Sequence, residues 1–115
     1  MKDRRTERWW PWRAAIVAGL VLAALTTAHA AAPTPKAVGI EEFAFAPATL
    51  TVPVGTTVTW TNHDEEPHTV TSATGAFRSA GLSNEETFSQ TFTDRGTYQY
   101  FCALHPHMKA TVIVK

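Results

Sequence analysis

The sequence predicts an all-β fold, an antiparallel Greek-key sandwich or barrel of seven to eight strands. The chain has 115 residues, which is enough for one domain and not for two. From residue 37 onward, short runs of alternating or β-branched residues recur between turn signals rich in Gly, Pro, Asn and Asp. No helical period of convincing length appears after residue 30. Many short strands with frequent turns are typical of a sandwich or barrel.

The first 36 residues differ from the rest. Five basic residues lie before an uncharged apolar run, Ala14 to Ala28, and Ala28-His29-Ala30 then offers small residues at the positions that a signal peptidase reads. We therefore predict a signal peptide over 1–30, a linker over 31–36 and one folded domain over 37–115. Such a signal implies export to the periplasm. An uncleaved N-terminal anchor is the alternative, and only in that case do we expect a membrane contact.

The first half of the domain is expected to contain three strands. The clearest is Thr56–Asn62, where threonines alternate with Val58 and Trp60, as expected for a strand with one buried face. The expected segments in order are the strand Val38–Glu42, an irregular step over 43–47, the strand Thr49–Val52 ending at Pro53, a turn at Val54-Gly55, and the strand Thr56–Asn62.

The second half opens with a polar, acidic loop and is expected to hold four strands. In Thr87–Phe92, Phe88 and Phe92 alternate with small hydroxyl residues. The expected segments are the loop 63–67, the strand His68–Ser72, an irregular stretch over 73–84, the strands Thr87–Phe92 and Thr97–Cys102, a ligand-rich loop, and the strand Lys109–Lys115. The candidate core residues are Val58, Trp60, Val70, Phe88, Phe92, Tyr98, Tyr100, Val112 and Val114.

The charge balance of the predicted mature domain is mildly acidic. Residues 31–115 hold five lysines and arginines and eight carboxylates, a net charge of −3, whereas the full chain is neutral. A domain of this charge has no electrostatic reason to bind nucleic acid, and none is expected as a partner.

One short loop carries most of the metal-binding chemistry. Cys102-Ala103-Leu104-His105-Pro106-His107-Met108 lies between two expected strands, so a thiol, an imidazole and a thioether converge. Cys102 is the only cysteine, so it has no partner for an internal disulfide. Zn²⁺ prefers thiolate, imidazole and carboxylate, whereas a Cys with two His and a distant Met is typical of copper. The expected ligands in this loop are therefore Cys102, His105 and Met108.

The fourth ligand has to be a histidine from elsewhere, and His63, His68 and His107 are the candidates. His107 is flanked by Pro106 and Met108 and is expected to point away, and His63 lies in the acidic loop. His68 opens a strand immediately after Pro67, which restricts the approach of that strand. His68 is the favoured ligand.

These motifs resemble the cupredoxins, and within them the amicyanin and plastocyanin-like group. The resemblance rests on Phe45–Leu50, Val54–Asn62 and Pro67–Val70 in the first half, and on Gly96–Cys102 followed by His105-Pro106 and Met108 in the second. The two residues from Cys to His and the two from His to Met resemble the short amicyanin loop. The resemblance implies one type 1 copper ion held by His68, Cys102, His105 and Met108.

The resemblance also implies details around the thiolate. The Thr69 N–H should reach the sulfur of Cys102, and Thr69 stands where the family usually has an Asn that ties the two ligand segments together. A hydroxyl can make one such bond. Pro106 has no N–H and so cannot give the sulfur the second hydrogen bond found in some longer-loop relatives.

The function implied is that of a small soluble electron carrier and not an enzyme. Four protein ligands leave no open position for a substrate, and one domain without a second histidine cluster does not suit a multicopper oxidase or nitrite reductase. We expect a monomer that meets a redox donor and a redox acceptor transiently, through the exposed edge of His105 and an apolar patch of Pro47, Leu104 and Pro106. The alternative is copper storage, delivery or resistance, against which the single Met of residues 31–115 argues.

Overall fold

The computed structural model describes residues 18–28 and 31–115 of the chain. Residues 18–28 are exposed and contain neither helix nor strand. Among the described residues, no helix is long and apolar enough to cross a membrane. Most of the predicted signal peptide over 1–30 lies outside the described residues, so its cleavage stays a prediction.

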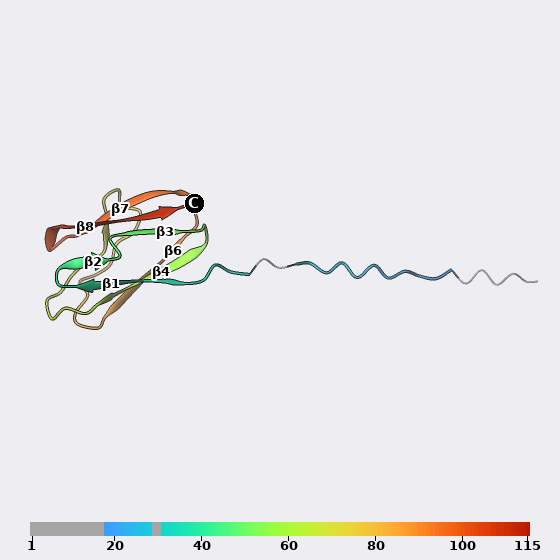
Figure 1. The fold of residues 1–115 in the computed structure, drawn as a ribbon, viewed down its shortest axis with the longest axis horizontal. Helices are drawn as coiled ribbons and strands as arrows, with labels where there is room; N and C mark the ends of the chain where they lie inside the picture. Colours follow the sequence, from blue (N-terminus) through green and yellow to red (C-terminus); the bar gives the residue numbers. More distant parts are fainter. Residues whose placement is uncertain (1–17, 29–30) are drawn as a thin grey trace, which may run out of the picture.

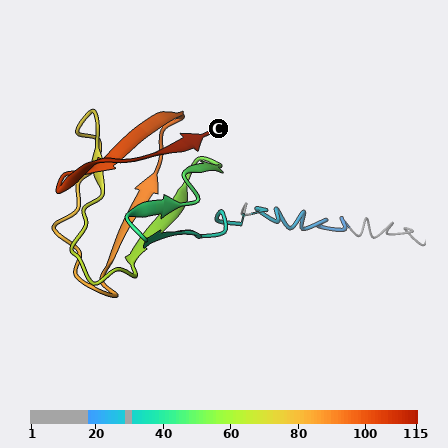
Figure 2. The same cartoon turned by 60° about the vertical axis from the view of Figure 1, so that its left-hand side comes forward.

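Residues 31–115 form two four-stranded sheets packed face to face (Figures 1 and 2). The strands are β1 (Lys36–Glu41), β2 (Ala44–Ala46), β3 (Thr49–Val52), β4 (Thr56–Asn62), β5 (Thr71–Ser72), β6 (Thr87–Phe92), β7 (Gly96–Cys102) and β8 (His105–Val114). One sheet has the order β2-β1-β4-β6 and the other has the order β3-β8-β7-β5. The predicted all-β sandwich is confirmed, in its open form and without closure into a barrel.

Both sheets are mixed, whereas the sequence predicted purely antiparallel sheets. Strand β1 runs parallel to β4, with Val38 opposite Trp60, and β3 runs parallel to β8, with Leu50 opposite Val112. Between β1 and β4 the chain crosses to the other sheet as β3 and returns, so β4 enters beside β1 in the same direction. The remaining pairs are antiparallel.

The elements differ from the sequence expectations at four main points, and β1, β7 and β8 also differ by one residue at one end, at Glu41, Gly96 and Val114. Strand β1 begins at Lys36, inside the expected linker, because it continues the pairing with β4. The expected irregular step contains β2, which pairs with β1 and turns Phe45 into the core. Strand β5 is only Thr71–Ser72, so His68 lies before it in an isolated bridge with Leu82. Strand β8 begins at His105 and not at Lys109.

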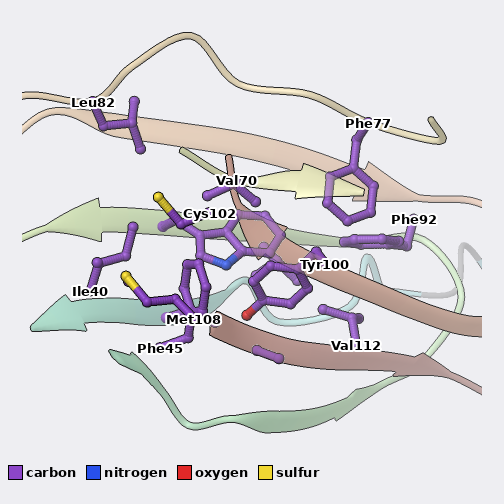
Figure 3. Close-up of a cluster of buried hydrophobic side chains, with 14 of the residues drawn as sticks. Ile40, Phe45, Val70, Phe77, Leu82, Phe92, Tyr100, Cys102, Met108 and Val112 are labelled. Atoms are coloured by element: carbon purple, nitrogen blue, oxygen red, sulfur yellow. The ribbon is translucent and has the colours of Figure 1, made fainter. Parts of the chain in front are cut away.

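The core lies between the two sheets and is rich in aromatic rings (Figure 3). Of the nine expected core residues, seven are buried, and Phe88 and Tyr98 are partly buried against them. The Tyr100 ring of one sheet meets the Trp60 and Phe45 rings of the other at centroid distances of 5.5 and 4.8 Å. Burial of such rings is the main source of stability in a domain of this size.

Candidate metal centre

The turn between β7 and β8 is tighter than the seven-residue loop expected from sequence. Cys102 pairs directly with His105, so only Ala103 and Leu104 connect the two strands. The register is irregular between Phe101 and Cys102. Cys102 pairs with His105 and Phe101 pairs with Lys109, so residues 106–108, with Met108 among them, lie in the irregular part of β8 between these two pairs.

Three donor atoms converge at this end of the sandwich. The Sγ of Cys102 lies 3.8 Å from Nδ1 of His68 and 3.7 Å from Nδ1 of His105. Among the described residues, these three form the one group of His, Cys, Asp or Glu side chains close enough to share a metal ion, with donor atoms within 4.8 Å of one another. His68 and Cys102 are fully buried, and His105 is partly exposed.

Met108 reaches the same end of the core from β8. Its side chain is buried. Figure 3 shows the sulfur atoms of Met108 and Cys102 at the same end of the hydrophobic cluster, away from Phe77 and Phe92. Met108 is thus placed at the same end of the core as the Cys102 sulfur, as a weak fourth ligand requires.

Thr69 ties the two ligand segments together. Its N–H donates to Sγ of Cys102 at 3.3 Å, so the predicted hydrogen bond to the thiolate is confirmed. Its Oγ1 accepts a 2.7 Å hydrogen bond from the N–H of Ala103 and bonds to Oγ1 of Thr71 at 2.9 Å. The single hydroxyl thus bridges the His68 segment and the β7–β8 turn across 34 residues of sequence.

Asp64 supports the ring of His68 from behind. Its Oδ2 lies 2.8 Å from Nε2 of His68, on the side of the ring opposite the donor atom Nδ1. Burial would raise the pKa of Asp64, but the N–H groups of Phe43 and Glu42 and the ring of His68 together hold the pKa below its usual range. Asp64 is therefore an anion beside His68 at neutral pH.

Phe43 covers both imidazoles. Its ring meets those of His68 and His105 edge-on, each at a centroid distance of 5.0 Å, and remains 38% exposed. Sequence reasoning missed Phe43 and Asp64. A carboxylate or carbonyl behind a metal-binding histidine is the rule, so the acidic loop before His68 was the available signal for Asp64. Phe43 lies in the β1–β2 turn, and only the tertiary fold brings it to the site.

The other two histidine candidates stand apart from the donor cluster. His63 is exposed, and its Nδ1 lies 3.2 Å from Oε1 of Glu85. His107 is exposed too, with its ring centroid 6.4 Å from that of His105. The choice of His68 over these two therefore agrees with the geometry.

Comparison with known proteins identifies the family. Residues 14–114 match the family described as Cupredoxin-like domain. The chain belongs to this family. Amicyanin from Paracoccus versutus is 36% identical over 83 residues, which cover 68% of the chain but only 63% of that protein.

Solved cupredoxin structures share the fold. A novel purple cupredoxin from Nitrosopumilus maritimus is 33% identical with a TM-score of 0.65, and the match covers 70% of the chain and 99% of that protein. A Cu(I) form of an amicyanin variant is 34% identical with a TM-score of 0.68, covering 76% and 86%. For this cupredoxin, the family and the donor set of one thiolate, two imidazoles and one thioether indicate a single type 1 copper ion as cofactor.

Proposed function

We propose that the chain is a type 1 copper protein that carries single electrons between two redox partners. The observation that carries the proposal is the buried cluster in which the Cys102 sulfur lies within 3.8 Å of two imidazole nitrogens. His68, Cys102 and His105 would hold the copper ion, with the thioether of Met108 as a weaker fourth ligand. Copper bound there supplies a one-electron Cu(II)/Cu(I) couple.

The protein's own contribution is to hold the donor atoms in fixed positions and to exclude solvent from them. His68 and Cys102 have no solvent exposure, and Met108 is buried as well. The Thr69 N–H reaches the Cys102 sulfur and stabilises negative charge there. Donors held in this way change position little between the two oxidation states, which suits repeated electron transfer.

The proposed route for electrons is the edge of His105. His68 is fully buried, whereas His105 is partly exposed and lies next to Leu104, whose side chain is 53% exposed. Pro47 and Pro106 are exposed as well. We expect these apolar residues to contact partners in brief encounters through a small interface.

Export to the periplasm is part of the proposal. It rests on the signal-like residues 1–30, with cleavage after Ala30. Intact-mass measurement of the protein recovered from the periplasm should give a chain that starts at Ala31. A full-length chain recovered with membranes would instead indicate the uncleaved anchor.

Copper titration with matched histidine variants tests the proposed site. Cu(II) added to the purified domain should produce an intense visible band from thiolate-to-copper charge transfer, and voltammetry should show a reversible one-electron wave. Cys102→Ala and His68→Ala should abolish the band, while His63→Ala should retain it, because His63 lies outside the cluster. A wild-type protein that binds only Cu(I) and stays colourless would reject the electron carrier in favour of copper storage or delivery.

A further inference from the structure

The carboxylate of Asp64 joins two segments that surround the metal centre. Its Oδ2 contacts Nε2 of His68 at 2.8 Å and accepts the N–H of Phe43 at 3.0 Å, and its Oδ1 accepts the N–H of Glu42 at 2.8 Å. The Asp64 side chain is only 11% exposed. Three hydrogen bonds to one nearly buried carboxylate are more than a solvated loop residue needs.

The contact with Nε2 decides which nitrogen of His68 carries the proton. Since a carboxylate only accepts, the proton of a neutral His68 ring belongs on Nε2, where it can donate to Asp64. Nδ1 is then left with its lone pair directed at the Cys102 side, 3.8 Å from the sulfur. This is the tautomer that a metal-binding Nδ1 requires.

His105 has no equivalent support. Within residues 31–115, the structure shows no hydrogen bond from its ring to any group other than the Cys102 sulfur. The two imidazoles therefore differ: one is buried and held by an anion, and the other is partly exposed and held by packing. Asp64 acts on only one of them.

The second role of the carboxylate concerns the ring of Phe43. Glu42 and Phe43 have φ angles of 53° and 57°, in the left-handed region that non-glycine residues seldom adopt. Both N–H groups of this turn donate hydrogen bonds to the Asp64 carboxylate. These hydrogen bonds thereby hold the Phe43 ring edge-on to His68 and His105.

We propose that Asp64 is a positioning residue of the copper site, which fixes His68 in its Nε2–H tautomer and keeps Phe43 over both ligand imidazoles. The inference rests on the proposed copper function and adds no chemical step to it. A negative charge hydrogen-bonded to a ligand imidazole makes the ring a stronger donor, so Asp64 stabilises Cu(II) more than Cu(I). Its removal should raise the reduction potential.

The test compares Asp64→Asn with Glu85→Gln in the holoprotein. Both changes remove one negative charge beside a histidine, but Glu85 contacts exposed His63, which is not in the donor cluster. In Asp64→Asn, one amide oxygen cannot accept all three N–H groups, so Cu(II) binding should weaken roughly 10- to 100-fold. The potential should rise by about 59 mV for each tenfold loss of Cu(II) affinity relative to Cu(I).

Glu85→Gln should change Cu(II) affinity and potential much less, because an exposed charge is screened. Equal shifts of Cu(II) affinity and reduction potential in the two variants would mean that Asp64 acts only through its charge, and would overturn the inference. Unchanged affinity and potential in Asp64→Asn would overturn it too. The measurements of Cu(II) affinity and of reduction potential both require a wild-type protein that turns blue with Cu(II) and gives a reversible wave in voltammetry. A wild type that fails there rejects the proposed function and the role of Asp64 with it, whereas a blue, reversible wild type with an unchanged Asp64→Asn protein overturns the role of Asp64 alone.

A measurement on the unaltered protein covers the case in which Asp64→Asn does not fold. In the diamagnetic Cu(I) form, nitrogen-15 NMR of the histidine rings should show a His68 Nε2–H that exchanges slowly with water. The corresponding proton of His105 should exchange faster, because no hydrogen bond to its Nε2 is found within residues 31–115. Equal exchange at the two rings would overturn the inference.

Discussion

Pro106 is the residue whose chemistry bears most directly on the thiolate of Cys102. The sulfur accepts one backbone hydrogen bond, from Thr69, and Pro106 has no N–H to add another. We expect Pro106→Ala to supply an N–H near the sulfur, to withdraw electron density from it and so to raise the reduction potential. Voltammetry measures the shift.

Pro53→Ala is a suitable control for this change, because Pro53 precedes β4 at the far end of the sandwich from Asn62 and His68. An unchanged or lowered potential in Pro106→Ala would mean that the missing N–H does not set the electron density of the thiolate.

The proposed thioether ligand, Met108, can be replaced with little disturbance of the core. Leu has nearly the volume of Met, so Met108→Leu should cost less than about 1.5 kcal/mol of unfolding free energy at this buried site. Loss of the weak thioether donor should weaken Cu(II) binding and raise the potential while the colour persists. Chemical denaturation measures the unfolding free energy, copper competition measures the Cu(II) affinity, and voltammetry measures the reduction potential. An unchanged potential would exclude Met108 as a ligand.

At the scale of the elements, the site depends on one hairpin and one cross-connection. The β7–β8 hairpin carries Cys102, His105 and Met108, and Thr69 connects it to the segment of His68. Without that hydroxyl, the N–H of Ala103 would lose its acceptor, and the contacts of the Cys102 sulfur with the Thr69 N–H and with His68 would remain between the two segments.

Thr69→Val tests this connection. Valine has the same shape but leaves the Ala103 N–H without its acceptor, which should cost about 1–3 kcal/mol of unfolding free energy. Copper should also dissociate faster from the loosened site. Thr57→Val is the matched control, because it removes an exposed hydroxyl that bonds to Thr91 on the outer face of the β4–β6 pair. Equal losses from the two variants, measured by denaturation, would contradict a special role for Thr69.

The elements also show what sequence reasoning could reach. Alternation in Thr56–Asn62 predicted a strand with alternating burial, and that pattern is observed. Ligand spacing predicted the loop residues, because short spacing restricts geometry whatever the surrounding fold. The parallel pairs could not be predicted, since each joins strands that are distant in sequence. Strand β2 and the start of β8 pair with the neighbouring strands β1 and β7, but their residues, Ala-Phe-Ala and His-Pro-His, include no β-branched side chain that would signal a strand. Phe43 was missed because its contacts with His68 and His105 join segments distant in sequence, whereas Asp64 lies only four residues before His68 and was signalled by the acidic loop.

On the scale of the whole molecule, Tyr100 couples the two sheets and also limits stability at high pH. Burial raises the pKa of Tyr100 to about 12. The unfolded state would ionise near pH 10, so the native state holds its proton over a range in which the unfolded state has lost it. The contribution of the protonated Tyr100 side chain to the free energy of unfolding is complete below pH 10 and is lost as the pH rises towards 12.

Denaturation of the metal-free domain at several pH values measures this loss. Two pKa units correspond to about 3 kcal/mol of unfolding free energy between pH 10 and pH 12. Tyr100→Phe keeps the ring beside Trp60 and Phe45 but has no phenol, so its stability should fall less over the same range. Parallel curves for the two proteins would assign the alkaline loss to other groups.

The carboxylates of the folded domain are gathered at one end. Seven of the eight lie in three segments, 41–42, 64–66 and 85–86, which are linked by the contacts of Asp64, His63 and Asn62. Arg95 and Lys115 lie at the opposite end, where β7 begins and β8 ends. The domain therefore has a permanent electric dipole whose negative pole is the metal end. Near a positively charged surface the molecule rotates to present that end first, an orienting torque that fades beyond a screening length of about 8 Å in physiological salt.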